Sequence, residues 1–123
     1  MERKRIVVVE DSYIIQLLIQ TILVDYDYVL DLFHNGKEAL TSLTDNPPDL
    51  LILDIMMPVM DGFTLLEKIK SNRNYPILIV TARTDYGSIE KAMEMGVTDY
   101  LIKPFNTIDL INKVDRLLLV NSK

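Results

Sequence analysis

The chain has 123 residues, a net charge of −5, 49% hydrophobic residues and no cysteine. These values predict one domain over residues 1–123 with an apolar core, and they exclude disulfides and thiolate metal sites. The acidic balance argues against direct nucleic-acid binding, because no basic patch offsets the repulsion of phosphates. The four apolar residues after the basic start are too few for a signal peptide or membrane span, so we expect a cytoplasmic protein.

Strands and helices alternate in the first half of the chain. The predicted elements are, in order, a strand at residues 5–9, a helix at 12–25, a strand at 28–33 and a helix from 35 to about 44. Ser12 is a suitable N-cap for the first helix. The second strand carries fewer apolar residues and is predicted at the edge of the sheet. Pro47 and Pro48 end the second helix, because proline cannot continue it.

The second half continues the alternation. The predicted elements are a strand at residues 50–53, a helix from 62 to about 71, a strand at 77–80, a helix at 86–95, a strand at 98–102 and a helix at about 107–119. Gly96 follows the fourth helix, where a left-handed cap residue is common. No internal repeat, low-complexity tract or linker interrupts this pattern.

The short aliphatic runs of the strands are typical of a parallel sheet that is buried on both faces. Right-handed connections between parallel strands then require helices on both faces, two on one and three on the other. We therefore predict an α/β fold, a doubly wound (βα)5 domain.

Polar side chains follow four of these apolar runs. Glu10 and Asp11 follow the first, Asp54 the third, Thr81 the fourth and Lys103 the fifth strand. Because the carboxyl ends of parallel strands share one edge, these groups should meet in one shallow pocket. Any single acid could merely cap a helix or end a strand, but agreement among four strand ends favours a functional site.

Three carboxylates in one pocket need a cation or raised pKa values, because two charges about 4 Å apart repel by roughly 4 kcal/mol at an effective dielectric near 20. Lys103 supplies one positive charge. Carboxylates without His or Cys favour Mg²⁺, with Mn²⁺ as the alternative, over zinc. Such a metal bridges to a phosphoryl group, which Thr81 and Lys103 could hold, and Asp54 could attack phosphorus as a nucleophile.

At this point the chain resembles the receiver domains of bacterial two-component response regulators over essentially its whole length. The motifs that carry the resemblance are Glu10-Asp11, the run DIMMPVMDG at residues 54–62, Thr81-Ala82 and the run YLIKPF at residues 100–105. The resemblance implies a CheY-like, flavodoxin-like fold with strand order 2-1-3-4-5. It also implies a cis peptide bond between Lys103 and Pro104.

The resemblance assigns roles to individual residues. It implies that Asp54 accepts a phosphoryl group and that Asp11, Asp54 and the backbone carbonyl of Met56 bind Mg²⁺, with Glu10 an outer ligand through water. Lys103 is expected to pair with the phosphoryl oxygens and Thr81 to donate its hydroxyl to them. Tyr100 matches the aromatic switch residue. Met56 and Arg83 match positions that tune the lifetime of the phosphoryl group.

The implied phosphodonor is a sensor histidine kinase or a histidine phosphotransfer protein. The implied recipient of the signal is an effector protein or output domain that binds the face formed by residues 86–119, through which some receivers also dimerise. We expect a stand-alone receiver or a fragment of a longer regulator.

The alternatives are a Mg²⁺-dependent phosphatase with an aspartate nucleophile, a flavin-binding module and a receiver-like module that is never phosphorylated. A phosphatase of this type needs a second acid two residues after the nucleophile, where this chain has Met56. A flavin site needs a glycine-rich phosphate loop, which the sequence does not contain.

Three further predictions concern surfaces. In the first helix, Ile15, Leu18, Ile19 and Ile22 form a core stripe at helical spacing, whereas Ile14 and Leu17 either line a buried rim or dock a kinase helix. His34 is expected on the surface. Asp99 and Lys113 could pair across a dimer, but an exposed contact within the chain that contributes little to stability is the preferred interpretation.

Overall fold

The computed structural model describes residues 3–57, 59–69, 73–82 and 86–120. It contains five strands and five helices in strict alternation, as predicted. Their bounds are β1 (Lys4–Val9), α1 (Tyr13–Leu23), β2 (Tyr28–Phe33), α2 (Gly36–Asp45), β3 (Leu50–Leu53), α3 (Gly62–Ile69), β4 (Ile77–Thr81), α4 (Tyr86–Glu94), β5 (Asp99–Ile102) and α5 (Thr107–Val120).

Most predicted bounds lie within one residue of the observed ones. The clearest difference is α1, which is shorter than the predicted helix at both ends. Ser12 caps it as expected, its Oγ accepting a hydrogen bond from the Ile15 N–H at 3.3 Å. The predicted end of the third helix near residue 71 lies outside the described residues. No helix among those described is long and apolar enough to cross a membrane.

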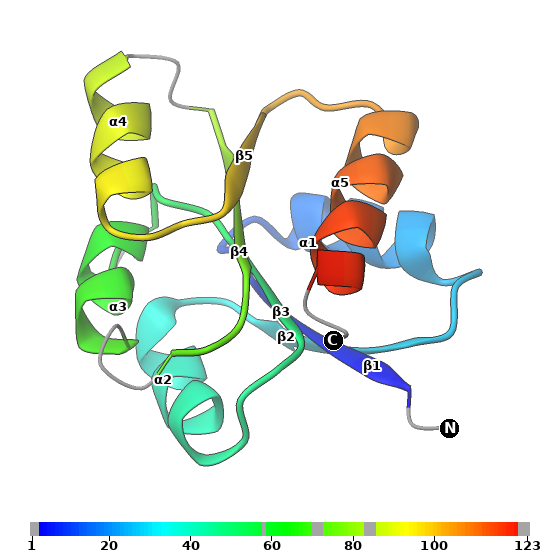
Figure 1. Cartoon of the computed structure of the whole chain (residues 1–123), viewed down its shortest axis with the longest axis horizontal. Coiled ribbons are helices and arrows are strands. Elements are labelled where there is room, and N and C mark those ends of the chain that lie inside the picture. Colours follow the sequence, from blue (N-terminus) through cyan, green and yellow to red (C-terminus); the bar gives the residue numbers. More distant parts are fainter. Residues whose placement is uncertain (1–2, 58, 70–72, 83–85, 121–123) are drawn as a thin grey trace.

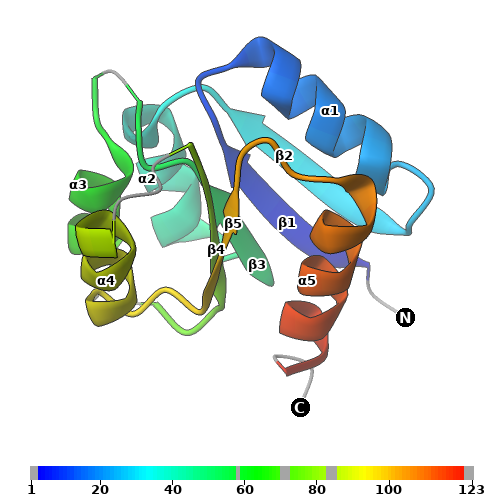
Figure 2. The same cartoon turned by 90° about the horizontal axis from the view of Figure 1, so that it is seen from above.

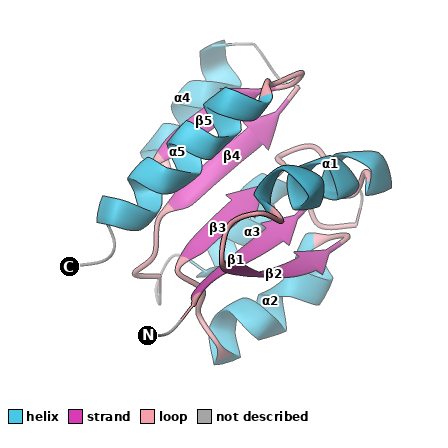
Figure 3. Ribbon diagram, turned by 90° about the vertical axis from the view of Figure 1, so that its right-hand side faces the viewer, coloured by secondary structure: helices cyan, strands magenta, loops and turns pink. Residues whose placement is uncertain are grey.

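The sheet is wholly parallel, in the order β2-β1-β3-β4-β5. Figure 3 shows the strands pointing in one direction, so that their carboxyl ends lie along one edge. The edge strand β2 is only partly buried, whereas β3 and β4 are buried along their full length. The predicted doubly wound fold and strand order are confirmed.

Helices cover both faces of the sheet, as the handedness of the connections requires. Figures 1 and 2 show α1 and α5 on one face and α2, α3 and α4 on the other. Side chains alternate between the two faces along a strand. Val7 and Val9 therefore belong to the core beneath α2–α4, and Ile6 and Val8 to the core beneath α1 and α5. This sandwich holds the strand ends rigidly from both sides.

Two glycines and one proline have special backbone conformations or contacts in the loops, at both edges of the sheet. A Cβ at Gly62 would lie 2.7 Å from the Ile55 Cα and 2.8 Å from the Asp54 carbonyl oxygen, so only glycine lets α3 approach the end of β3 this closely. Gly96 has a φ of +92° after α4, as predicted for a left-handed cap. The Lys103–Pro104 peptide bond is cis, as the resemblance implied.

Candidate functional site

The carboxylates of Glu10, Asp11 and Asp54 form one cluster at the carboxyl edge of the sheet. The register sets this position, because Val9 pairs with Leu53 and the next residues, Glu10 and Asp54, leave the sheet side by side. The Asp54 N–H donates to the Val9 carbonyl at 3.0 Å, which joins the two strand ends. One carboxylate oxygen from each acid lies within 4.8 Å of the other two. The structure therefore brings the three acids together as the sequence predicted.

Lys103 reaches this cluster from the end of β5. Its Nζ lies 2.7 Å from Glu10 Oε1 as an ion pair and donates a hydrogen bond to Asp54 Oδ2 at 3.2 Å. Burial by itself would lower the pKa of Lys103, but the contacts with Glu10 and Asp54 outweigh burial and raise it. Lys103 is therefore held in its charged form beside both carboxylates.

Glu10 is the most deeply buried acid of the cluster. Its Oε2 accepts a hydrogen bond from the Ser12 N–H at 3.0 Å. Its Oε1 is buried and accepts no aligned hydrogen bond from the described residues, although Lys103 lies close by. Burial raises the pKa of Glu10 to about 7, although Lys103 and the Ser12 N–H oppose the rise. An ion pair with Lys103, and not an aligned hydrogen bond, therefore holds this buried oxygen.

Asp54 is buried and held at both carboxylate oxygens. Oδ2 contacts Lys103, and Oδ1 accepts a hydrogen bond from the Met56 N–H at 3.2 Å. The backbone of Met56 therefore lies beside the carboxylate, while its side chain is exposed. Asp11 is exposed, and its carboxylate forms no hydrogen bond or ion pair with the other residues that the structure describes.

Thr81 and Tyr100 occupy neighbouring strands near the same edge. Thr81 pairs with Ile102, and its carbonyl accepts a hydrogen bond from the Lys103 N–H at 2.8 Å. The Thr81 side chain is fully buried, whereas Tyr100 exposes 38% of its surface. Arg83, the second residue expected to tune phosphoryl lifetime, lies outside the described residues.

The residues fit a divalent cation. Three carboxylates and, among the described residues, a single lysine leave the cluster with excess negative charge. All the side-chain atoms that could bind a metal here are carboxylate oxygens, which are the ligands that Mg²⁺ prefers. The acidic cluster is therefore consistent with a magnesium site.

One buried polar residue near the cluster was not predicted. Gln16 is only 3% exposed and belongs to the inward face of α1 together with Ile19 and Leu23. The predicted core stripe was wrong at Leu18, which is 39% exposed. The sequence did hold a signal for the burial of Gln16, because this residue stands at helical spacing from Ile19 and Leu23. Helical periodicity does not reveal, however, which groups such a residue contacts.

The surface predictions have clear outcomes. Ile14 and Leu17 are exposed, so they do not form a buried rim. His34 is exposed, as expected. Lys113 Nζ lies 3.0 Å from Asp99 Oδ2, so the two residues pair within the chain as preferred, but both side chains are partly buried and not exposed.

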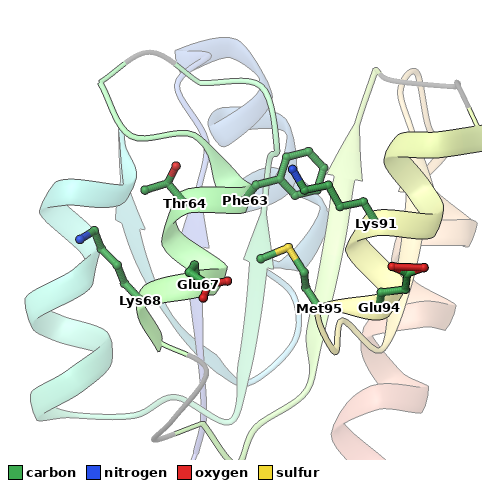
Figure 4. A pocket seen from close by; sticks show the side chains of 7 residues that line it. All are labelled: Phe63, Thr64, Glu67, Lys68, Lys91, Glu94 and Met95. Atoms are coloured by element: carbon green, nitrogen blue, oxygen red, sulfur yellow. The ribbon is translucent and has the colours of Figure 1, made fainter.

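A separate groove lies between α3 and α4. It has a volume of about 570 Å³ and combines an apolar floor with two lysines and two glutamates. Figure 4 shows Phe63 and Met95 between the helices, with Lys91 reaching over Phe63; the ammonium lies 4.3 Å from the ring centroid. None of the residues that line the groove belongs to the acidic cluster.

The fold and the acidic cluster define a doubly wound α/β domain with a carboxylate site suited to a divalent cation. The family model described as "Response regulator receiver domain" matches residues 6–115. The chain therefore belongs to the receiver domains of two-component response regulators.

Individual proteins agree with this assignment. The transcriptional regulatory protein PcoR of Escherichia coli is 37% identical over 116 residues, which cover 94% of this chain and 51% of PcoR. The chemotaxis protein CheY4 of Vibrio cholerae superposes with a TM-score of 0.87 at 28% identity, covering 94% of this chain and 99% of CheY4. The receiver domain of the Pseudomonas aeruginosa sensor histidine kinase PA1611 superposes with a TM-score of 0.86 at 29% identity, covering 95% and 98% of the two chains. That receiver holds a magnesium ion in its active-site cleft.

The chain spans about half the length of the first curated relatives that it matches. The family assignment favours a signalling phosphoacceptor over the phosphatase and flavin-binding alternatives.

Proposed function

We propose that this receiver accepts a phosphoryl group on Asp54 from the phosphohistidine of a sensor histidine kinase or a histidine phosphotransfer protein. The observation that carries the proposal is the convergence of a buried Asp54, two further acids and Lys103 at one strand edge, with Lys103 Nζ 3.2 Å from Asp54 Oδ2. A carboxylate nucleophile flanked by a fixed cation is the arrangement that phosphoryl transfer to an aspartate requires.

The transfer exchanges one bond to phosphorus for another. A carboxylate oxygen of Asp54 attacks phosphorus, and the bond between phosphorus and the histidine nitrogen breaks. The imidazole keeps the electron pair, and Asp54 becomes a mixed anhydride. Lys103 is already charged and in place, so it stabilises the negative charge on the phosphoryl oxygens without rearrangement. We assign the Thr81 hydroxyl a second contact with these oxygens.

Asp11, Asp54 and the backbone carbonyl of Met56 would hold Mg²⁺, with Glu10 acting through water; Mn²⁺ is the alternative ion. The bound metal supplies positive charge that offsets the repulsion between the carboxylates and the incoming phosphoryl group.

The phosphodonor protein would dock on the exposed apolar face of α1, next to the acidic cluster. This face presents Tyr13, Ile14, Leu17 and Leu18, all of them exposed. An apolar surface of this kind on a helix marks an interaction site. The signal would then pass to an effector protein or output domain through α4, β5 and α5, where Tyr100 turns inward as Thr81 moves toward the phosphoryl group.

The first experiment tests Asp54 as the phosphoacceptor. The protein is incubated with Mg²⁺ and acetyl phosphate, and its intact mass is measured. We expect the addition of one phosphoryl group that is stable to acid and labile to base, and we expect Asp54→Ala and Asp54→Asn to abolish it. Asp25→Asn, at an exposed acid outside the cluster, is the matched control and should be phosphorylated like the wild type.

Modification that persists in Asp54→Asn would place the phosphoryl group elsewhere and contradict the proposal. No modification of the wild type by acetyl phosphate or by a phosphorylated histidine phosphotransfer protein would favour an interaction module that is never phosphorylated. Rapid turnover of phosphomonoesters would favour the phosphatase alternative instead.

A further inference from the structure

Gln16 bridges two strand ends from the buried face of α1. Its side-chain Nε2 donates to the Glu10 carbonyl at 3.0 Å and to the Phe33 carbonyl at 2.8 Å. Both acceptors are carbonyl oxygens, so the amide nitrogen must face them and both of its protons are used. A buried amide with both donors satisfied is held rigidly in place.

These two bonds complete a network around the backbone of Glu10. The Glu10 N–H donates to the same Phe33 carbonyl at 3.0 Å, so the end of β1 is tied to the end of β2. With the Gln16 contact, both the N–H and the carbonyl of Glu10 are fixed. Among the described residues, Gln16 is the one side chain that donates a hydrogen bond to the buried Glu10 carbonyl.

The Glu10 carbonyl belongs to the peptide plane that joins the two acids. That plane also contains the N and Cα of Asp11, because the peptide bond is planar. Asp11 forms no hydrogen bond or ion pair with the described residues that would orient its carboxylate. This peptide plane therefore fixes the N and Cα atoms of Asp11, from which its carboxylate extends toward Asp54.

We infer that Gln16 is a positioning residue for the metal site, which orients Asp11 by holding the peptide between Glu10 and Asp11. This inference rests on the proposed function, because it assigns Asp11 as a metal ligand. Residues that fix the ligands of a metal commonly contribute a factor of 10–100 to its affinity. The inference differs from a purely structural role for Gln16, which would affect stability but not the affinity for metal.

The test compares three variants by their affinity for Mg²⁺ alone. Gln16→Met keeps the length of the side chain and removes both donors, whereas Gln16→Asn keeps the amide and withdraws it by one methylene. Ile19→Ala is the matched control, because Ile19 is buried on the same face of α1 and is not involved in the network. The Kd is measured by calorimetry and by the shift of the Asp11 backbone amide in ¹⁵N NMR spectra, and stability by urea unfolding.

We expect both Gln16 variants to bind Mg²⁺ about tenfold more weakly than the wild type. We expect the Kd of Ile19→Ala to change by less than about twofold, although this variant is also less stable. Gln16→Asn keeps the test decisive if Gln16→Met does not fold.

Unchanged affinity in a folded Gln16 variant would overturn the inference and leave the proposed function intact. An equal loss of affinity in Ile19→Ala would also overturn it, because the effect would then follow stability alone. Failure of the wild type to bind Mg²⁺ would contradict the metal site itself, and this inference with it.

Discussion

Lys103 is the one basic side chain in contact with the acidic cluster among the described residues, and it is shared between Glu10 and Asp54. Three acids and one base leave net negative charge in a partly buried site, where Coulomb interactions are stronger than in water. An arrangement that maximised stability would avoid this excess charge. Excess negative charge is expected at a functional site that binds a cation, because functional sites commonly reduce stability.

Val59 is a second unfavourable feature at the residue scale. It lies in the loop between β3 and α3, has a φ of +70° and is 78% exposed. A β-branched residue in the left-handed region costs roughly 1–2 kcal/mol, whereas asparagine tolerates this conformation. We expect Val59→Asn to raise the free energy of unfolding by about 0.5–1 kcal/mol in urea denaturation.

The control for this substitution is Val24→Asn. Val24 is also exposed, but its φ of −63° is favourable for valine. Its replacement should change stability by less than about 0.5 kcal/mol. Equal effects at the two positions would show that polarity, and not backbone conformation, is responsible.

At the scale of secondary-structure elements, ion pairs connect α5 with β5. The Asp99 side chain contacts Lys113 and Arg116 of α5, and its Oδ1 accepts a hydrogen bond from the Tyr100 N–H at 2.8 Å. Burial alone would raise the pKa of Asp99, but these contacts outweigh burial and hold the pKa below its ordinary value of 3.8. The ionised form of Asp99 is therefore more strongly favoured over the protonated form in the folded chain than in the unfolded chain.

This shift has a definite sign for stability. A carboxyl with a depressed pKa in the folded state stabilises the fold above the pKa of the unfolded state, and the stabilisation is lost as the pH falls through the folded pKa. We expect Asp99→Asn to destabilise the protein at pH 7 and to have a smaller effect at pH 3. Urea unfolding of both proteins at several pH values measures this difference.

A double-mutant cycle with Lys113→Met assigns the effect to the contact between β5 and α5. The coupling energy between the two sites should decrease as the pH is lowered through the acidic range. A difference between wild type and Asp99→Asn that is the same at pH 3 and pH 7 would contradict the assignment.

At the scale of the whole molecule, the sheet connects the acidic cluster with the face of α4, β5 and α5. Lys103 follows β5 directly, and its N–H is bonded to the Thr81 carbonyl at the end of β4. Tyr100 lies on β5, three residues before Lys103. A change at the cluster can therefore bias the position of Tyr100 through two adjacent strands, as a shift between existing conformations.

We expect the side chain of Tyr100 to become more buried when Asp54 carries a phosphoryl mimic. The measurement is the aromatic NMR signal of Tyr100 with and without beryllofluoride and Mg²⁺, assigned by Tyr100→Phe. Tyr26, stacked on Tyr28 at a centroid distance of 6.0 Å, is the internal reference and should not shift. An unchanged Tyr100 signal in a protein saturated with the mimic would remove this residue from the switch.

The sequence alone determined the order of the elements and the residues at the strand ends. Aliphatic runs, helix caps such as Ser12 and breakers such as Pro47 act over a few residues, so their effects can be predicted locally. The acids at positions 10, 11 and 54 could be placed at one edge because a parallel sheet aligns the ends of its strands.

Only the tertiary structure decided which side chains turn inward and which partners they meet. Gln16 is buried, where it donates hydrogen bonds to two strand-end carbonyls, and Leu18 is exposed; this rotation of α1 about its axis follows from how the helix packs on the sheet. Lys103 lies against Glu10 as well as Asp54, and Asp99 pairs within the chain, because β1, β3, β5 and α5 come together only in the folded sheet. These contacts join residues far apart in sequence, so their geometry depends on the packing of the whole domain and is not encoded in any local pattern.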